Sequence, residues 1–256
     1  ERDLDSPTTF VGTVLDNAAR PLGNARLELW VGGQIVAEAF TDIEGRFAFA
    51  GVPDGPAHVV ADGSTADTLA GEPIPLNSFP FVGYDFTMVP NAENRLPQPV
   101  LLPQQDPDNE FPYDGTQDVE MTVAGIEGLK FTVEAGTVVT LADGTVIDGV
   151  NGNSVQLTLD QVHFDDIPMP LPDGASYPFA WTLQPKAATF EPPVAVELPN
   201  MAGLTPGSIG YILQWDGELD EFVITASGQV SEDGSVIRSD PGAGITVAGW
   251  GGACPP

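Results

Sequence analysis

The chain has 256 residues and a formal net charge of −29, since 37 acidic side chains are set against 8 lysines and arginines. A surface this acidic repels the phosphates of nucleic acids and of anionic lipids, so we expect neither nucleic-acid binding nor membrane insertion. The length allows one large domain or two ordinary ones.

Glycine and proline punctuate the whole chain, with 29 and 25 copies. They separate short apolar runs at nearly regular intervals, and no segment keeps a helical period. The pattern predicts an all-β protein of two β-sandwich modules with almost no helix.

The first module is predicted over residues 9–89, after a flexible lead at 1–8. Residues 25–31 alternate strictly: Leu27 and Leu29 share one face, and Glu28 and Trp30 share the other. A period of two is typical of a half-buried strand. Gly32-Gly33 then predicts a tight hairpin into the strand 34–40.

This stretch resembles the carboxypeptidase regulatory-like domain, a transthyretin-like β-sandwich. The matching residues are Gly12, Asp16, Pro21, Leu22, Ala25, Leu27, Thr41, Asp42, Gly45, Phe47, Phe49, Gly51, Val52 and Pro53. In physical terms, the Asp42–Gly45 turn needs a side-chain acceptor and a flexible exit, and the two phenylalanines fill a core. The resemblance implies a non-catalytic accessory module.

Residues 90–117 are rich in proline and acidic side chains and predict an extended, semi-rigid linker, in which residues 100–102 are a candidate edge strand. A second β-sandwich module is predicted over 118–250, followed by a tail at 251–256.

Residues 181–250 carry a second resemblance, through the runs Trp181-Thr182-Leu183-Gln184-Pro185, Val230-Ser231-Glu232-Asp233-Gly234 and Ala248-Gly249-Trp250. They look like sandwich segments of very large bacterial surface proteins and, more weakly, like the ZU-type sandwich. Some ZU-type domains cleave themselves at His-Phe-Ser. This chain has His163-Phe164-Asp165, without the serine, so no cleavage is expected.

Catalytic patterns are weak throughout, so we expect no enzyme. His58 lies in a short strand and suits a structural role better than a triad. His163 with Asp165 and Asp166 is a weak metal alternative. Chance carboxylate pairs among 37 acids leave glycosidase chemistry the hardest to exclude.

The best ion candidate comprises Asp106, Asp108, Asn109, Glu110 and Asp114, whose alternating oxygen ligands suit Ca²⁺. The competing interpretation is a solvated acidic linker. If Ca²⁺ binds, we expect it to stiffen the joint between the modules.

Three further side chains bear on function. Trp30 lies on the polar face of its strand and is the candidate platform for a sugar ring, against ordinary packing. Lys130 is predicted to be exposed, which disfavours an isopeptide crosslink. Cys254 is the sole cysteine, so no intrachain disulfide forms.

These features favour a non-catalytic, extracellular structural or assembly module of a bacterial surface or secreted protein, such as a filament subunit or stalk. Its partners would be further copies or neighbouring domains, bound through sheet edges, with 1–8 or the Val100 region adding a strand. A glycan- or protein-binding adhesin module and an accessory fragment of a larger secreted enzyme or toxin remain open.

Overall fold

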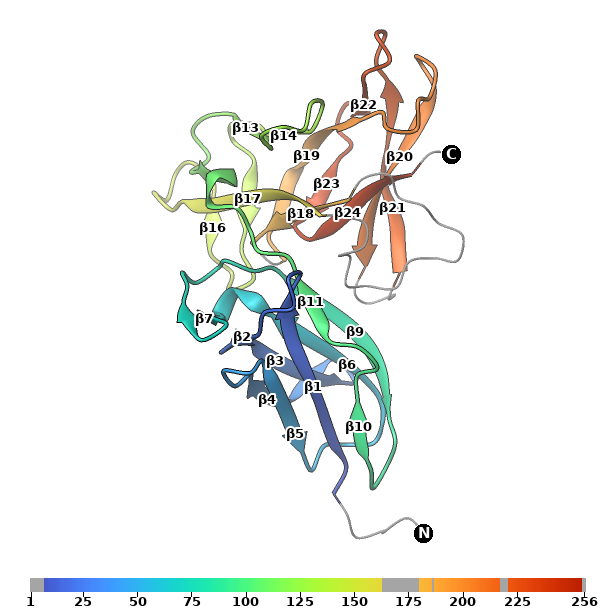
Figure 1. Ribbon diagram of the computed structural model, residues 1–256. Coiled ribbons are helices and arrows are strands. Elements are labelled where there is room, and N and C mark those ends of the chain that lie inside the picture. Colours follow the sequence, from blue (N-terminus) through green and yellow to red (C-terminus); the bar gives the residue numbers. More distant parts are fainter. Residues whose placement is uncertain (1–6, 163–179, 186, 217–220, 255–256) are drawn as a thin grey trace. The chain divides into compact units, whose positions relative to one another are not determined.

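A computed structural model describes residues 7–162, 180–185, 187–216 and 221–254 (Figure 1). The described residues form two compact units. Unit 1 comprises residues 7–105, and unit 2 comprises 106–162 and the described residues from 180 onward. Each unit is treated by itself below.

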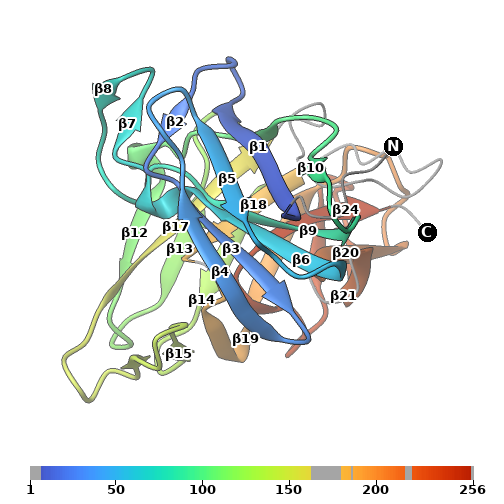
Figure 2. The ribbon, with the colours of Figure 1, turned by 90° about the horizontal axis from the view of Figure 1, so that it is seen from below.

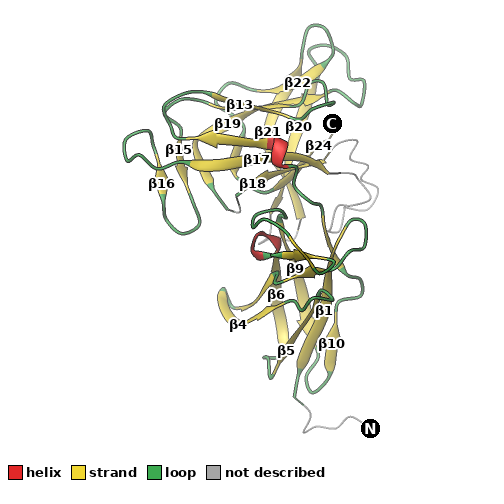
Figure 3. Cartoon of the chain, turned by 60° about the vertical axis from the view of Figure 1, so that its left-hand side comes forward, coloured by secondary structure: helices red, strands yellow, loops and turns green. Residues whose placement is uncertain are grey.

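The described residues form strands and loops almost throughout (Figure 3). Their helical content is two 3-10 turns, η1 (Gly63–Thr65) and η2 (Pro107–Asn109). The all-β fold class is therefore confirmed. Within the described ranges, no helix has the length and apolar character needed to cross a bilayer.

Unit 1 consists of two four-stranded sheets and a small three-stranded one. In the first sheet, β1 pairs with β5 on one side and with β10 and β11 on the other; the second runs β4-β3-β6-β9 and the third β2-β7-β8 (Figure 2). The strands are β1 (Thr9–Asp16), β2 (Leu22–Gly23), β3 (Arg26–Val31), β4 (Gln34–Phe40), β5 (Arg46–Ala50), β6 (Gly55–Asp62), β7 (Thr68–Leu69), β8 (Glu72–Pro73), β9 (Phe81–Met88), β10 (Glu93–Arg95) and β11 (Val100–Leu102).

Aromatic rings fill the core of unit 1. Phe10 of β1 contacts Phe47 and Phe49 of the neighbouring β5, with ring centroids 5.7 and 6.3 Å away. It also contacts Phe86 of β9, at 5.0 Å, and thereby joins the two large sheets. Leu27 and Leu29 are fully buried, as the alternation in β3 predicts.

The Asp42–Gly45 turn has the predicted construction. Asp42 Oδ1 accepts hydrogen bonds from the backbone N–H of Glu44 and of Arg46, at 3.0 and 2.8 Å. Gly45 has φ 73°, and a Cβ there would lie 2.4 Å from the carbonyl oxygen of Val14. Both the backbone angle and the space therefore require glycine.

The segment predicted as a linker contributes strands to its neighbours. β10 and β11 both pair in parallel with β1. Val100 and Leu102 expose 1% and 0% of their surface. The side chain of Asn94 accepts a hydrogen bond from the N–H of Val89 and donates to the carbonyl oxygens of Val89 and Thr9. Residues 93–102 are therefore part of unit 1 rather than a free connector, because their apolar side chains complete its core.

Unit 2 is built on one large curled sheet. Its path is β12-β17-β18-β24-β20-β21-β22-β19-β14-β13, and β15, β16 and β23 attach around β19. The strands are β12 (Glu110–Tyr113), β13 (Val119–Thr122), β14 (Lys130–Val133), β15 (Val138–Thr140), β16 (Val146–Ile147), β17 (Val155–Val162), β18 (Ala180–Gln184), β19 (Thr189–Pro199), β20 (Ile209–Asp216), β21 (Glu221–Val230), β22 (Val236–Ser239), β23 (Ile245–Val247) and β24 (Trp250–Cys254).

The core of unit 2 lies inside this curl, with Phe131 and Trp181 in edge-to-face contact at 4.9 Å. The middle of β17 and all of β18 are buried on both faces. Leu157 and Leu159 point into the core, while Asp160 and Thr182 lie on the opposite face and expose only 6% and 0%. Polar side chains are thus buried outside the apolar core.

The predicted tail also differs from the structure. Residues 251–254 belong to β24, which lies between β18 and β20. A Cβ on Gly251 would lie 2.0 Å from the Trp181 ring, so glycine lets the indole pack on the backbone of β24. A run of glycines gives no alternation, which is why the strand was not predicted.

Candidate functional site

The outer side of β4 is a sheet edge of unit 1. β4 pairs with β3, and no described residue pairs with its other side. Along this edge and the turn after it, Ile35, Val36, Phe40 and Ile43 expose 41%, 44%, 54% and 65% of their surface. Backbone donors and acceptors beside exposed apolar side chains are what an added strand needs.

A β-bulge in β4 limits strand pairing along part of this edge. Val36 is an extra residue in β4, because Leu29 pairs with Ala37 while Trp30 pairs with Ile35. Such bulges commonly protect sheet edges. The bulge leaves Ala37–Phe40 in regular register.

The charge of Glu38 in that regular segment is balanced. Arg26 of β3 forms an ion pair with Glu38 and a second one, at 3.1 Å, with Glu28. The Glu38 hydrogen bond, as the main cause, raises the pKa of Arg26 above its ordinary value. The edge therefore carries no unpaired charge in this regular segment.

Trp30 lies on the outer face of the same sheet and is half-buried. Its indole Nε1 donates to Glu28 Oε2 at 2.9 Å, and Glu28 is itself held by Arg26. The predicted sugar platform is thus fixed in orientation by its own strand.

His58 lies directly beside Trp30, on β6, and Asp85 lies beside His58 on β9. His58 Nδ1 and Asp85 Oδ1 are 2.8 Å apart. A Cβ on Gly83 would lie 2.5 Å from His58 Nε2, so the imidazole lies over that glycine. Trp30, His58 and Asp85 form one row across three strands.

The predicted Ca²⁺ residues do not share one surface. Asp106 caps η2, with Oδ1 accepting from the N–H of Asp108 at 2.9 Å. Asn109 is buried, and Glu110 is exposed at the start of β12. Asp114 is exposed and accepts from the N–H and hydroxyl of Thr116, which lower its pKa. No group of three or more His, Cys, Asp or Glu that could hold a metal is found among the described residues.

The structure adds Asp160 of β17 to this region. Asp160 Oδ1 accepts from Asn109 Nδ2 at 2.8 Å and from the N–H of Asp106 at 3.2 Å. Burial raises the pKa of Asp160, and these two hydrogen bonds oppose the rise. Sequence spacing does not reveal this partner, because 51 residues separate Asn109 from Asp160. A single acidic residue in an apolar strand, Leu157 to Val162, is the signal that was available.

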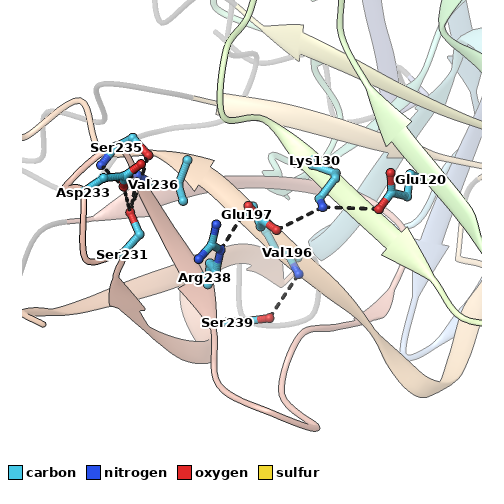
Figure 4. Close-up of polar contacts among 10 residues, drawn as sticks. All are labelled: Glu120, Lys130, Val196, Glu197, Ser231, Asp233, Ser235, Val236, Arg238 and Ser239. Carbon is cyan, nitrogen blue, oxygen red and sulfur yellow. Dashed lines mark hydrogen bonds and ion pairs between the residues drawn. The ribbon is translucent and has the colours of Figure 1, made fainter. Parts of the chain in front are cut away.

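Lys130 is not a free exposed lysine. It lies between Glu120 of β13 and Glu197 of β19, at 3.3 and 3.1 Å, and Arg238 of β22 also pairs with Glu197, at 3.2 Å (Figure 4). The hydrogen bond to Glu197 is the main cause that raises the pKa of Lys130. Charges of alternating sign thus cross four adjacent strands.

The β21–β22 turn is closed by Asp233. Its Oδ1 accepts from the hydroxyls of Ser231 and Ser235, at 2.5 and 2.7 Å (Figure 4). These bonds lower the pKa of Asp233 far below its ordinary value, and the bond from Ser231 has the largest effect. The arrangement holds a turn.

Other predicted residues fall outside this description. His163, Asp165 and Asp166 lie outside the described residues. The backbone of Cys254 belongs to β24, and its side chain is not described.

Comparisons with known proteins assign no family. No family model matches the chain, and no curated protein matches it. The resemblance of residues 9–89 to the carboxypeptidase regulatory-like domain therefore stays a prediction.

Among solved structures, the chain shows distant similarity to the Bacillus anthracis TIE protein, with a TM-score of 0.29, 10% identity, and coverage of 96% of this chain and 48% of that chain. Fervidolysin from Fervidobacterium pennivorans, a keratinolytic enzyme related to subtilisin, gives a TM-score of 0.26 at 12% identity. The match covers 96% of this chain and 33% of that chain. BcpA, the major pilin subunit of Bacillus cereus, gives a TM-score of 0.28 at 11% identity. The match covers 91% of this chain and 84% of that chain. The chain thus spans about half and a third of the first two proteins.

Proposed function

We propose that the chain is a non-catalytic structural module of a bacterial surface or secreted protein, and that it assembles through the β4 edge of unit 1. The observation that carries the proposal is the exposed apolar row of β4 on a side where no described strand pairs.

The proposed partner is β4 of a second copy, in antiparallel pairing about a two-fold axis. Such an interface uses the same strand twice and closes without an open row of subunits. The Arg26–Glu38 ion pair favours this partner. Arg26 balances the negative charge of Glu38, which would otherwise repel Glu38 of the second copy.

The net charge of −29 opposes any self-association. Salt screens this repulsion over about 10 Å at 0.1 M ionic strength and less at higher salt. Association through an apolar, locally neutral edge should therefore strengthen as salt rises, whereas association through surface ion pairs would weaken.

Light scattering coupled to gel filtration tests this over a range of protein and salt concentrations. A dimer that forms with increasing concentration and persists at high salt supports the proposal. A protein that stays monomeric at every concentration, alone and with Ca²⁺, would contradict assembly through β4. Negative-stain microscopy in parallel shows whether association goes on to fibres.

A second candidate function is glycan binding at Trp30, favoured by the row Trp30–His58–Asp85. An indole held by Glu28 offers a ring face for a sugar beside polar groups that bind hydroxyls. A glycan-array signal that Trp30→Ala abolishes and Trp250→Phe, a change at a buried indole, leaves intact supports this function. An array without signal counts against it.

A further inference from the structure

Asp160 is a buried carboxylate whose position is fixed through one oxygen. The residue exposes 6% of its surface, although it lies on the face of β17 opposite the apolar core. Asn109 and the backbone of Asp106 both donate to Oδ1. All three residues belong to unit 2. The carboxylate therefore cannot turn away without losing both hydrogen bonds.

The second oxygen of this carboxylate has no hydrogen-bond partner among the described residues. Asp160 Oδ2 is buried, and no described donor reaches it. Native proteins satisfy nearly all such atoms, with protein groups, water or ions. An unsatisfied buried group costs about 1–3 kcal/mol, and more when it is charged.

Protonation alone does not resolve the problem. An ionised Asp160 carries a buried negative charge, and no ion pair joins it to a described lysine, arginine or histidine. The neighbouring charge of Asp106 adds repulsion. A neutral Asp160 would instead place a hydroxyl donor where the described chain offers no acceptor. A cation beside Oδ2 removes both difficulties.

We propose that Oδ2 of Asp160 and the carboxylate of Asp106 bind a divalent cation of the Ca²⁺ class, with water completing its shell. The ligands are oxygens: the backbone N–H of Asp106 bonds Asp160, the charge of Asp106 acts on that carboxylate, and neither acid forms an ion pair with a described cationic side chain. Ca²⁺ accepts irregular shells of carboxylate, carbonyl and water oxygens, whereas Mg²⁺ demands a near-ideal octahedron. The site replaces the ligand set predicted from sequence, since Asp108, Glu110 and Asp114 have no part in it. It is independent of the β4 edge.

Calorimetric titration of the full chain with CaCl₂ at constant ionic strength is the test. We expect one saturable site in the native chain, set apart from diffuse binding by the other acids. Asp160→Asn should weaken it by at least the roughly 10-fold that loss of an outer-shell partner costs a metal site. Thermal unfolding should show a Ca²⁺-dependent rise in Tm that the variant lacks.

Asp114→Asn is the matched control, because it removes one exposed carboxylate of the predicted loop while an amide oxygen can still accept from Thr116. It should leave the site unchanged. Asp106→Asn provides a second variant if Asp160→Asn fails to fold, since asparagine caps a turn as well as aspartate. It too should weaken binding.

Absence of a saturable site would overturn the proposal, and the unpaired oxygen would then belong to a buried water. Binding that survives in Asp160→Asn, or that Asp114→Asn abolishes, would also overturn it, in favour of diffuse binding or of the exposed loop. Each result leaves the β4 assembly unaffected, so the two proposals fail separately.

Discussion

Phe10 of β1 and Phe86 of β9 lie 5.0 Å apart, ring centroid to ring centroid, and this contact links the two large sheets of unit 1. Phe10 is fully buried and also contacts two rings of β5. We therefore expect Phe10→Ala to lower the free energy of unfolding by about 3–5 kcal/mol, the usual cost of emptying such a site. Guanidinium unfolding followed by circular dichroism measures it.

The control for Phe10 is Phe40→Ala, which removes the same side chain from an exposed position on β4. It should change stability by no more than about 0.5 kcal/mol. Equal losses in the two variants would contradict the sandwich core described here.

The Lys130 row predicts a small, salt-dependent effect. Lys130→Met removes the cation between Glu120 and Glu197, whereas Lys130→Arg keeps it. Because the lysine side chain is 31% exposed, we expect Lys130→Met to cost about 1 kcal/mol or less. The loss should shrink in high salt, where screening weakens the pairs. A loss that is the same at low and high salt would show that packing rather than charge holds the row together.

Asp160 predicts a pH dependence in metal-free solution. Its folded pKa is raised, so the native state binds its proton more tightly than the unfolded chain does. The stability it contributes is present below the ordinary aspartate pKa of about 3.9 and is lost as pH rises through the folded pKa. Asp160→Asn lacks this loss, so the variant should gain stability relative to the native chain as pH rises from about 4.

Urea unfolding of both proteins in the presence of a chelator, across this pH range, gives the difference. A difference that stays constant with pH would mean that Asp160 does not titrate differently in the folded state.

Local pattern predicted much of unit 1. The alternation in β3 correctly predicted that Leu27 and Leu29 are buried, and the Asp42–Gly45 turn has the predicted acceptor and glycine. These features depend on neighbours within a few residues, which the sequence displays directly.

Longer-range pairings were not predictable from pattern. Residues 100–102 form the expected edge strand, β11, but proline spacing indicated a linker and gave no sign of β10 or of the parallel pairing of both strands with β1. β24 has glycines where side chains would reveal alternation. The Asp160–Asn109 contact joins β17 to the η2 turn, and the buried Oδ2 without a described partner depends on tertiary packing, which no local motif encodes.

The most direct test of assembly through β4 is sedimentation velocity of Val36→Lys beside Val150→Lys. Both positions are exposed, and both changes add one positive charge to the same acidic chain. General electrostatics would favour association equally in the two variants. A lysine on β4 adds a charge to the sheet edge of each copy, and a charged side chain on an edge strand disfavours the pairing of a further strand.

We predict that Val36→Lys raises the dimer dissociation constant at least about tenfold, or about 1.4 kcal/mol, while Val150→Lys associates like the native chain. Equal association of the two variants would contradict a β4 interface.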